Sequence, residues 1–146
     1  MRIIVFSDTH GNFAAMHKII KRNGDADLFI FLGDGLSEFR KLKSHYLDNN
    51  MICVKGNCDF DKELPESMVY VLPDGKRMFL AHGDKWGVNF SVENIYEKAK
   101  EEECQFALFG HTHKRYSFLF FRFQHWRQSS LYGQIQGHAT ICHRQQ

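Results

Sequence analysis

Short apolar runs alternate with segments of helical periodicity in the first third of the chain. The apolar run 2–6 predicts a strand, and the wholly apolar run 28–32 predicts a second strand buried on both faces. Apolar positions spaced by three and four residues predict one helix over 13–22 and another that has Ser37 as its N-cap. The run 51–54 predicts a third strand. This alternation is typical of parallel strands joined by helical crossovers.

The pattern changes to a hairpin in the middle of the chain. The runs 68–72 and 77–81 flank the turn signal Pro-Asp-Gly at 73–75, which predicts two antiparallel strands. The next segment predicts a helix over 91–103 with Ser91 as its N-cap. The apolar run 106–109 predicts another buried strand. The whole pattern indicates an α/β domain with a mixed sheet or two sheets. In such folds the loops at the carboxyl ends of parallel strands meet at one edge, where ligands bind.

Composition excludes several classes of protein. The 146 residues are 43% hydrophobic and 25% charged, which fits one globular domain. The net charge of +2 is too small for the basic excess of an electrostatic nucleic-acid binder, so we expect no such binding surface. No apolar run approaches the ~20 residues of a membrane span, and the N-terminal residues lack the pattern of a signal peptide. We therefore expect a cytoplasmic protein with reduced cysteines and no membrane association.

Charge divides the chain unevenly. All 17 acidic residues precede residue 104, and the last 29 residues contain no Asp, Glu, Lys or Pro. Residues 1–117 carry 16 basic and 17 acidic side chains, a net charge of −1, whereas 118–146 carry three arginines and no acid. We expect 1–117 to form the body of the domain. We expect 118–146 to be an atypical C-terminal segment rather than an independent domain.

Polar side chains follow five of the apolar runs directly. They are carboxylates, a carboxamide and imidazoles: Asp8 and His10, Asp34, Asn57, His82, and His111 with His113. Most of these loops also carry a glycine beside the polar residue, which lets the backbone approach an ion closely. If the strands are parallel neighbours, the side chains converge at one sheet edge. Mixed nitrogen and oxygen donors without thiolate suit Mn, Fe, Zn, Co or Ni.

Seven donors exceed the needs of one ion. If Asp34 bridges, they suffice for two ions, and two ions ~3.5–4 Å apart can clamp a phosphate and share a hydroxide as nucleophile. Each motif also has a simpler explanation when it is taken alone. Gly33-Asp34 and Gly56-Asn57 are common turn sequences, and His82 alone is consistent with a hydrogen-bonded core histidine. Their occurrence in one order, each at a strand end, favours a shared site.

The motif series resembles that of the calcineurin-like metallophosphoesterases, in particular the small single-domain phosphodiesterases of bacteria and archaea. The matching segments are Ser7–Asn12, Gly33-Asp34, Gly56–Asp59, His82-Gly83 and Gly110–His113, and the resemblance covers about residues 1–117. It implies a four-layer αββα sandwich. It also implies a metal-dependent phosphoesterase that hydrolyses phosphodiesters with a hydroxide bridging two divalent ions. Manganese is expected first, with Ni, Zn, Fe, Co and Mg as alternatives.

The resemblance also implies residue roles. The first ion is held by Asp8, His10, Asp34 and His113. The second ion is held by Asp34, Asn57, His82 and His111. Catalytic roles fall to Asp34, Asn57 and His111, and substrate contacts to Asn12, Asn57 and His82. Asn12 stands where the first helix begins, so its side chain is explained equally well as a phosphate donor and as a simple N-cap.

One position departs from the larger members of the family. They carry a histidine after the motif asparagine, thought to protonate the leaving group, whereas this chain has Cys58, as the small branch commonly does. A thiol is a poor acid beside two cations, so we expect a preference for aryl phosphodiesters, whose leaving groups depart unprotonated. The alternative for Cys58 is a small buried filler. Asp59 and Asp84 are expected to be turn residues or to orient a ligand histidine.

The segment 118–146 does not continue the family pattern. The expected Asn-Pro-Gly-Ser motif is absent, although 116–123 suits a strand. We attribute this to a reading-frame shift near 118–123 or to a divergent C-terminus, which would leave the second sheet incomplete and favour homo-oligomer formation through exposed apolar residues. Two alternatives to an active enzyme that binds a phosphoester substrate therefore stand. One is a non-catalytic scaffold on the same fold, and the other is an inactive, frameshifted product.

Overall fold

The computed structural model describes residues 1–113, 118–120 and 140–142. Its elements follow one another in chain order as β1 (Ile3–Phe6), α1 (Phe13–Arg22), β2 (Leu28–Phe31), α2 (Leu36–His45), β3 (Met51–Cys53), β4 (Ser67–Val71), β5 (Arg77–Ala81), the 3₁₀ helix η1 (Asp84–Trp86), α3 (Glu93–Glu101), β6 (Phe106–Phe109), β7 (Phe118–Phe120) and β8 (Thr140–Cys142). No helix in these ranges is both long enough and apolar enough to cross a bilayer.

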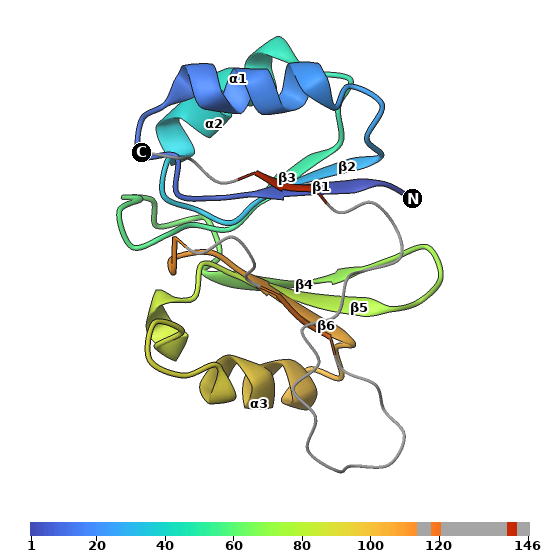
Figure 1. Cartoon of the computed structure of the whole chain (residues 1–146), viewed down its shortest axis with the longest axis vertical. Coiled ribbons are helices and arrows are strands. Elements are labelled where there is room, and N and C mark those ends of the chain that lie inside the picture. The colour runs from blue at the N-terminus through green and yellow to red at the C-terminus, as the bar shows by residue number, and fades with distance from the viewer. Residues whose placement is uncertain (114–117, 121–139, 143–146) are drawn as a thin grey trace.

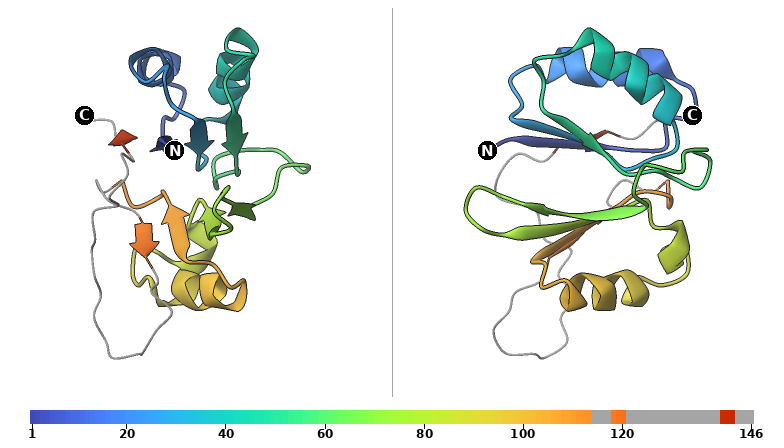
Figure 2. Two further views of the ribbon diagram at one scale, coloured as in Figure 1. Left: turned by 90° about the vertical axis from the view of Figure 1, so that its right-hand side faces the viewer. Right: turned by 180° about the vertical axis from the view of Figure 1, so that it is seen from behind.

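The elements form four layers, with two sheets inside and helices outside (Figures 1 and 2). The first sheet has the order β3-β2-β1-β8, and its strands are all parallel. The second sheet has the order β4-β5-β6-β7, in which β5 and β6 are parallel and the two edge strands are antiparallel to their neighbours. Helices α1 and α2 cover the first sheet, and α3 covers the second. The expected α/β fold, a four-layer αββα sandwich, is confirmed.

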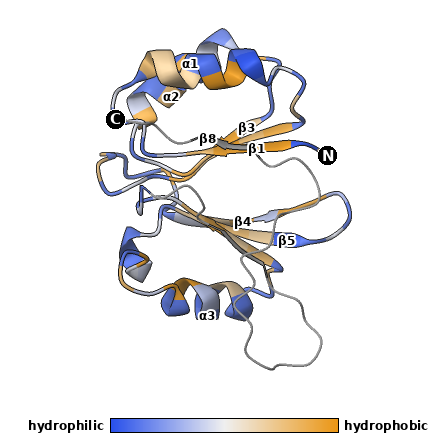
Figure 3. Cartoon of the chain, viewed as in Figure 1, coloured by the Kyte–Doolittle hydropathy of each residue, from blue (hydrophilic) through white to orange (hydrophobic). Residues whose placement is uncertain are grey.

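Alternating side chains divide the hydrophobic core into three clusters. Along β2, Phe29 and Phe31 pack against α1 and α2, whereas Leu28 and Ile30 face the second sheet. A third cluster joins β5 and β6 to α3 around Ile95. All four residues of β2 are therefore buried, as its continuous apolar sequence predicts. Figure 3 shows the apolar strands between the polar outer faces of the helices.

Most element bounds match the sequence pattern, but the two serine caps predicted for α2 and α3 are wrong. Helix α2 starts before Ser37. Its N-cap residue is Gly35, which makes no side-chain capping hydrogen bond. Helix α3 starts at Glu93, so Val92 takes the cap position and Ser91 only accepts a hydrogen bond from the Glu93 amide at 3.2 Å. A serine near the expected start is thus not sufficient to place a cap.

The C-terminal segment contributes two described strands. Strand β7 falls within the predicted run 116–123 and pairs with β6. Strand β8 lies parallel to β1, where the hydrophobic pattern predicts no element. The described second sheet thus has four strands. The remainder of 118–146, and with it the proposed frameshift, lies outside the described residues.

The parallel strands place the polar loops together. The loops after β1, β2, β3, β5 and β6 lie at one end of the sandwich, on the left in Figure 1. This is the arrangement that parallel strands predict, because their carboxyl ends share an edge. The two sheets face each other, so side chains from both can meet between these loops.

Candidate metal centre

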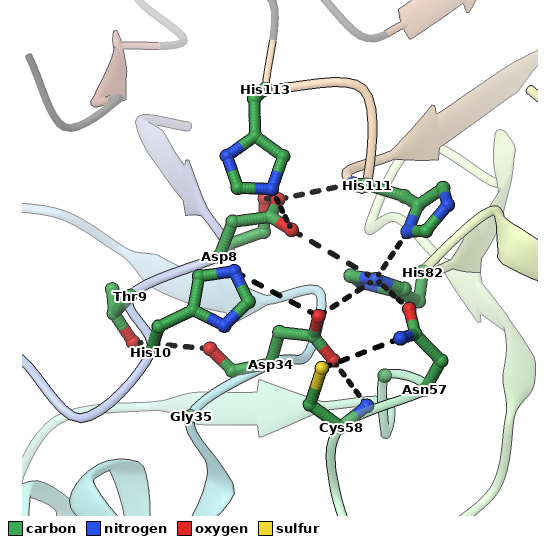
Figure 4. A network of polar contacts seen from close by, with 12 residues as sticks. Asp8, Thr9, His10, Asp34, Gly35, Asn57, Cys58, His82, His111 and His113 are labelled. Carbon is green, nitrogen blue, oxygen red and sulfur yellow. Dashed lines mark hydrogen bonds and ion pairs between the residues drawn. The ribbon is translucent and has the colours of Figure 1, made fainter. Parts of the chain in front are cut away.

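Three buried ionisable side chains form the floor of the site (Figure 4). Asp8 and Asp34 follow strands of the first sheet, and His82 follows β5 of the second; their exposed fractions are 3%, 2% and 0%. The Nε2 atom of His82 lies 3.8 Å from Asp8 Oδ1 and 3.4 Å from Asp34 Oδ2. Buried charged groups are costly unless they are paired or bind an ion. The two carboxylates of the floor therefore favour binding of a compensating positive charge.

The other three donors predicted for the second ion gather around His82 Nε2. Besides Asp34, His82 Nε2 has Asn57 Oδ1 at 3.1 Å and His111 Nδ1 at 3.2 Å. The other ring nitrogen, Nδ1, lies 2.8 Å from the carbonyl oxygen of Leu32 and donates to it. This hydrogen bond fixes the orientation of the ring so that Nε2 faces the site, as in histidines that bind metals.

The donors predicted for the first ion lie on the solvent side of the floor. His113 Nε2 is 3.6 Å from Asp8 Oδ1, and His10 Nε2 is 3.9 Å from Asp34 Oδ2. The rings of His10 and His113 stack with their centroids 5.4 Å apart. Ligand atoms of Asp8, His10 and His113 all lie within 4.8 Å of one another. Asp34 Oδ2 contacts donors of both groups, which is the position a bridging carboxylate needs.

One carboxylate oxygen at the floor has no hydrogen bond within the described part of the chain. Asp8 Oδ2 accepts hydrogen bonds from the hydroxyl of Ser7 and from the His111 amide, at 3.0 Å for the latter. The buried Asp8 Oδ1 accepts none from the described residues, and its histidine neighbours stand at 3.6 Å or more. Leaving such an oxygen unpaired costs on the order of several kcal/mol, and a cation would satisfy it. The residues present therefore fit the divalent ions that carboxylate and imidazole donors prefer.

The backbone is strained at the same residues. Among the described residues, six that are not glycine have a positive φ, and five of them are predicted ligands. These five are Asp8, His10, Asp34, His111 and His113, with φ between 42° and 65°. A left-handed conformation costs an L-residue about 1–2 kcal/mol. Such strain gathers at functional sites, where the surrounding structure holds it in place.

The floor residues also shift one another's acidity. Burial alone raises the pKa of Asp34, but hydrogen bonds from His82 and the Cys58 amide, with the positive charge of His82, hold that pKa well below its usual value. Burial lowers the pKa of His82, but hydrogen bonding and charge attraction from Asp34, with the charge of Asp8, raise that pKa above its usual value. Both shifts favour the charged forms, as expected when His82 and the buried carboxylates are paired with one another.

The structure decides between the alternatives left open for Cys58, Asp59 and Asn12. Cys58 is exposed rather than a buried filler, and hydrogen bonding to Asp34, followed by burial, raises the pKa of its thiol. Its sulfur lies within 4.8 Å of donors from His10 and Asp34, a grouping that the sequence did not suggest. Asp59 accepts hydrogen bonds from backbone amides and not from a ligand histidine. The N-cap role of Asn12 is confirmed, since its Oδ1 accepts from the Ala15 amide at 2.9 Å.

Comparison with known proteins gives two relatives that are described as phosphoesterases. The chain is 30% identical over 114 residues to the probable metallophosphoesterase YsnB of Bacillus subtilis (strain 168), an alignment that covers 77% of this chain and 64% of the relative. The chain therefore spans less than two thirds of that protein's length. A conserved Streptococcus pneumoniae TIGR4 protein, described as a predicted phosphoesterase, is 33% identical with a TM-score of 0.63, over 76% of this chain and 62% of its own.

A third likeness concerns the fold alone. A Vps29 structure from Entamoeba histolytica has a TM-score of 0.59 at 21% identity, over 80% of this chain and 67% of that one. The family model for the calcineurin-like phosphoesterase superfamily domain matches residues 1–121. This match covers all seven predicted donors and every described element except β8. The chain belongs to the calcineurin-like phosphoesterase superfamily.

Proposed function

We propose that the protein is a metal-dependent phosphodiesterase whose seven donors hold two divalent ions, with manganese the first candidate. The observation that carries the proposal is the position of Asp34 Oδ2, 3.4 Å from His82 Nε2 and 3.9 Å from His10 Nε2, between the two donor groups. The unpaired oxygen of Asp8 and the strained ligand loops support it. All seven donors precede residue 114, so the body 1–117 would carry the whole centre.

The chain's own residues would orient the reactants. When bound, the divalent ions would supply Lewis-acid polarisation of the phosphoryl oxygens and a nucleophile at neutral pH. Asp34 is held in place by the Cys58 amide at 2.8 Å, and His82 by the Leu32 carbonyl at 2.8 Å. The dipole at the N-terminus of α1, beside Asn12, favours a phosphoryl oxygen. Asn57 and His111 face the same space and would contact the substrate as it reacts.

The arrangement provides no efficient proton donor for the leaving group. The position of a proton-donating histidine is taken by Cys58, whose raised pKa makes its thiol a reluctant proton donor. Substrates with good leaving groups need no such donor. We therefore propose that aryl phosphodiesters are cleaved much faster than alkyl phosphodiesters.

The rival function is a non-catalytic scaffold on the same fold. The likeness to Vps29 concerns the fold and does not favour this rival. A scaffold has no use for the strained backbone at five donors or for the unpaired buried oxygen of Asp8. The retained donor set favours the enzyme.

Hydrolysis of bis-p-nitrophenyl phosphate in the presence of Mn²⁺ tests the proposal. We expect turnover by the folded protein, loss of turnover in Asp34→Ala and Asn57→Ala, and no loss in Asp74→Ala, which removes an exposed carboxylate of the β4–β5 turn. Circular dichroism establishes that each variant is folded. No turnover by folded protein that has bound Mn²⁺ would support the scaffold, and equal rates for aryl and alkyl diesters would contradict the role inferred from Cys58.

A further inference from the structure

We infer that Asp59 is a positioning residue for the metal centre, because its carboxylate fastens the loop that carries Asp34 to the loop that carries Asn57. The inference rests on the proposed function, since it concerns the same donors. Asp59 is itself no ligand: its two oxygens are occupied by backbone amides of both loops. It would act on the ions only through the residues it holds.

The carboxylate of Asp59 accepts four hydrogen bonds. Its Oδ2 accepts from the Asp34 amide at 2.8 Å and from the Gly56 amide at 2.9 Å. Its Oδ1 accepts from the Gly35 and Leu36 amides, both at 2.9 Å. Hydrogen bonds to an ionised carboxylate are about twice as strong as those between neutral groups. One side chain thus ties three successive amides after β2 to the loop after β3.

Helix capping explains only half of this contact. Helix α2 begins after Gly35, which has no side chain to cap it, and Asp59 Oδ1 supplies that cap from another loop. The other oxygen, Oδ2, joins Asp34 to Gly56 and has no part in the cap. The tie is also reciprocal, since Asp34 Oδ1 accepts from the Cys58 amide at 2.8 Å. Each carboxylate therefore holds the backbone of the other's loop.

The two loops touch with almost no space between them. A Cβ atom at Gly33 would lie 2.3 Å from the Gly56 nitrogen, and one at Gly56 would lie 2.1 Å from Asp34 Oδ1. Asp34 also has a left-handed backbone with φ of 62°, a conformation that its surroundings must maintain. Because the loops are in contact, a change in the hydrogen bonds at Asp59 is transmitted directly to Asp34.

The contact between the two loops determines which oxygen of Asp34 is free to bind an ion. Its Oδ1 is held by the Cys58 amide, so Oδ2 is left facing His82 at 3.4 Å. If the carboxylate of Asp59 is lost, the amides of Asp34 and Gly56 lose their shared acceptor, and the Asp34 side chain is free to turn. Residues that orient metal ligands in this way typically change metal affinity by about 10–100-fold when mutated.

A titration with Co²⁺ as the probe, followed by its visible absorption, tests the role of Asp59. The test variant is Asp59→Asn, which keeps the shape and removes the charge. The matched control is Asp61→Asn in the same loop. Asp61 also accepts from two backbone amides, those of Glu63 and Leu64 at 2.7 and 2.9 Å, and from Arg40 of α2. Among the described residues its side chain makes no hydrogen bond to residues 33–36 or 56–58. Circular dichroism and thermal melting report the fold of both variants.

Four outcomes separate the explanations. We expect Asp59→Asn to bind Co²⁺ about 10–100-fold more weakly than the unmodified chain, with a changed absorption band, and Asp61→Asn to keep the affinity and the band. A merely structural role would lower the melting temperature of Asp59→Asn and leave the Co²⁺ band and affinity unchanged, which would overturn the inference. Equal weakening in both variants would overturn it too. If the unmodified chain binds no Co²⁺, the proposed function itself has failed. Should Asp59→Asn not fold, Asp59→Glu is judged by the same criteria.

Discussion

A single methyl group at Gly56 provides a sharp test of the site geometry. Gly56 is not among the residues with positive φ, so alanine would meet no left-handed backbone strain there. The added Cβ would nevertheless lie 2.1 Å from Asp34 Oδ1, 2.6 Å from the Asp34 nitrogen and 2.8 Å from its Cγ. The substitution Gly56→Ala therefore acts on Asp34 through space alone.

The size of the effect follows from these distances. The Cβ–Oδ1 distance of 2.1 Å is more than 1 Å short of an ordinary contact of 3.4 Å. The loops or the carboxylate must move apart by about 1 Å, and a displacement of that size in a reacting constellation costs about 10²-fold in rate. Overpacking of this kind also lowers the free energy of unfolding by about 1–3 kcal/mol.

The assay is Mn²⁺-dependent hydrolysis of an aryl phosphodiester, with urea unfolding measured in parallel. The control is Gly24→Ala, because Gly24 also lacks a positive φ and its added Cβ would meet nothing within 4 Å. We expect turnover to fall about 10²-fold in Gly56→Ala and to stay within about twofold in Gly24→Ala. Undiminished turnover and metal affinity in folded Gly56→Ala would refute the contact between Gly56 and Asp34, or the importance of Asp34.

Three further predictions concern stability. Asn12→Ala should lower the free energy of unfolding in urea by about 1 kcal/mol and Asn12→Ser should restore it, because serine also caps helices; equal stability of all three proteins would contradict the cap. His82→Ala should lower the free energy of unfolding of the metal-free protein by about 3–5 kcal/mol, since two buried carboxylates lose their shared partner, and an unchanged urea midpoint would contradict that pairing. Mn²⁺ at 100 times its dissociation constant should raise the free energy of unfolding by about 2.7 kcal/mol for each ion bound, reversibly with EDTA; no rise in the melting temperature would mean that the native state binds no Mn²⁺.

The convergence of the seven predicted donors could be anticipated because its signals are local. Each donor follows a short apolar run that indicates a buried strand, and parallel pairing then brings the ends of those strands together. The donors Asp8, Asp34 and His82 lie far apart in the sequence, and this topology alone brings them together.

The features that the sequence missed depend on distant contacts. The cap of α2 comes from Asp59 in another loop, so Ser37, a favourable residue close to the start of α2, was misleading. Strand β8 is three residues long and is defined by its pairing with β1 rather than by any periodicity of its own. The close contact between Gly33 and Gly56 likewise arises from packing between loops, and a Gly-Asp or Gly-Asn pair does not reveal it.

The most direct test of the proposed centre is the number of Mn²⁺ ions bound by the folded chain, measured by equilibrium dialysis and metal analysis. Two donor groups that share Asp34 predict two ions for each chain. A folded protein that binds one ion, or none, would contradict the binuclear centre.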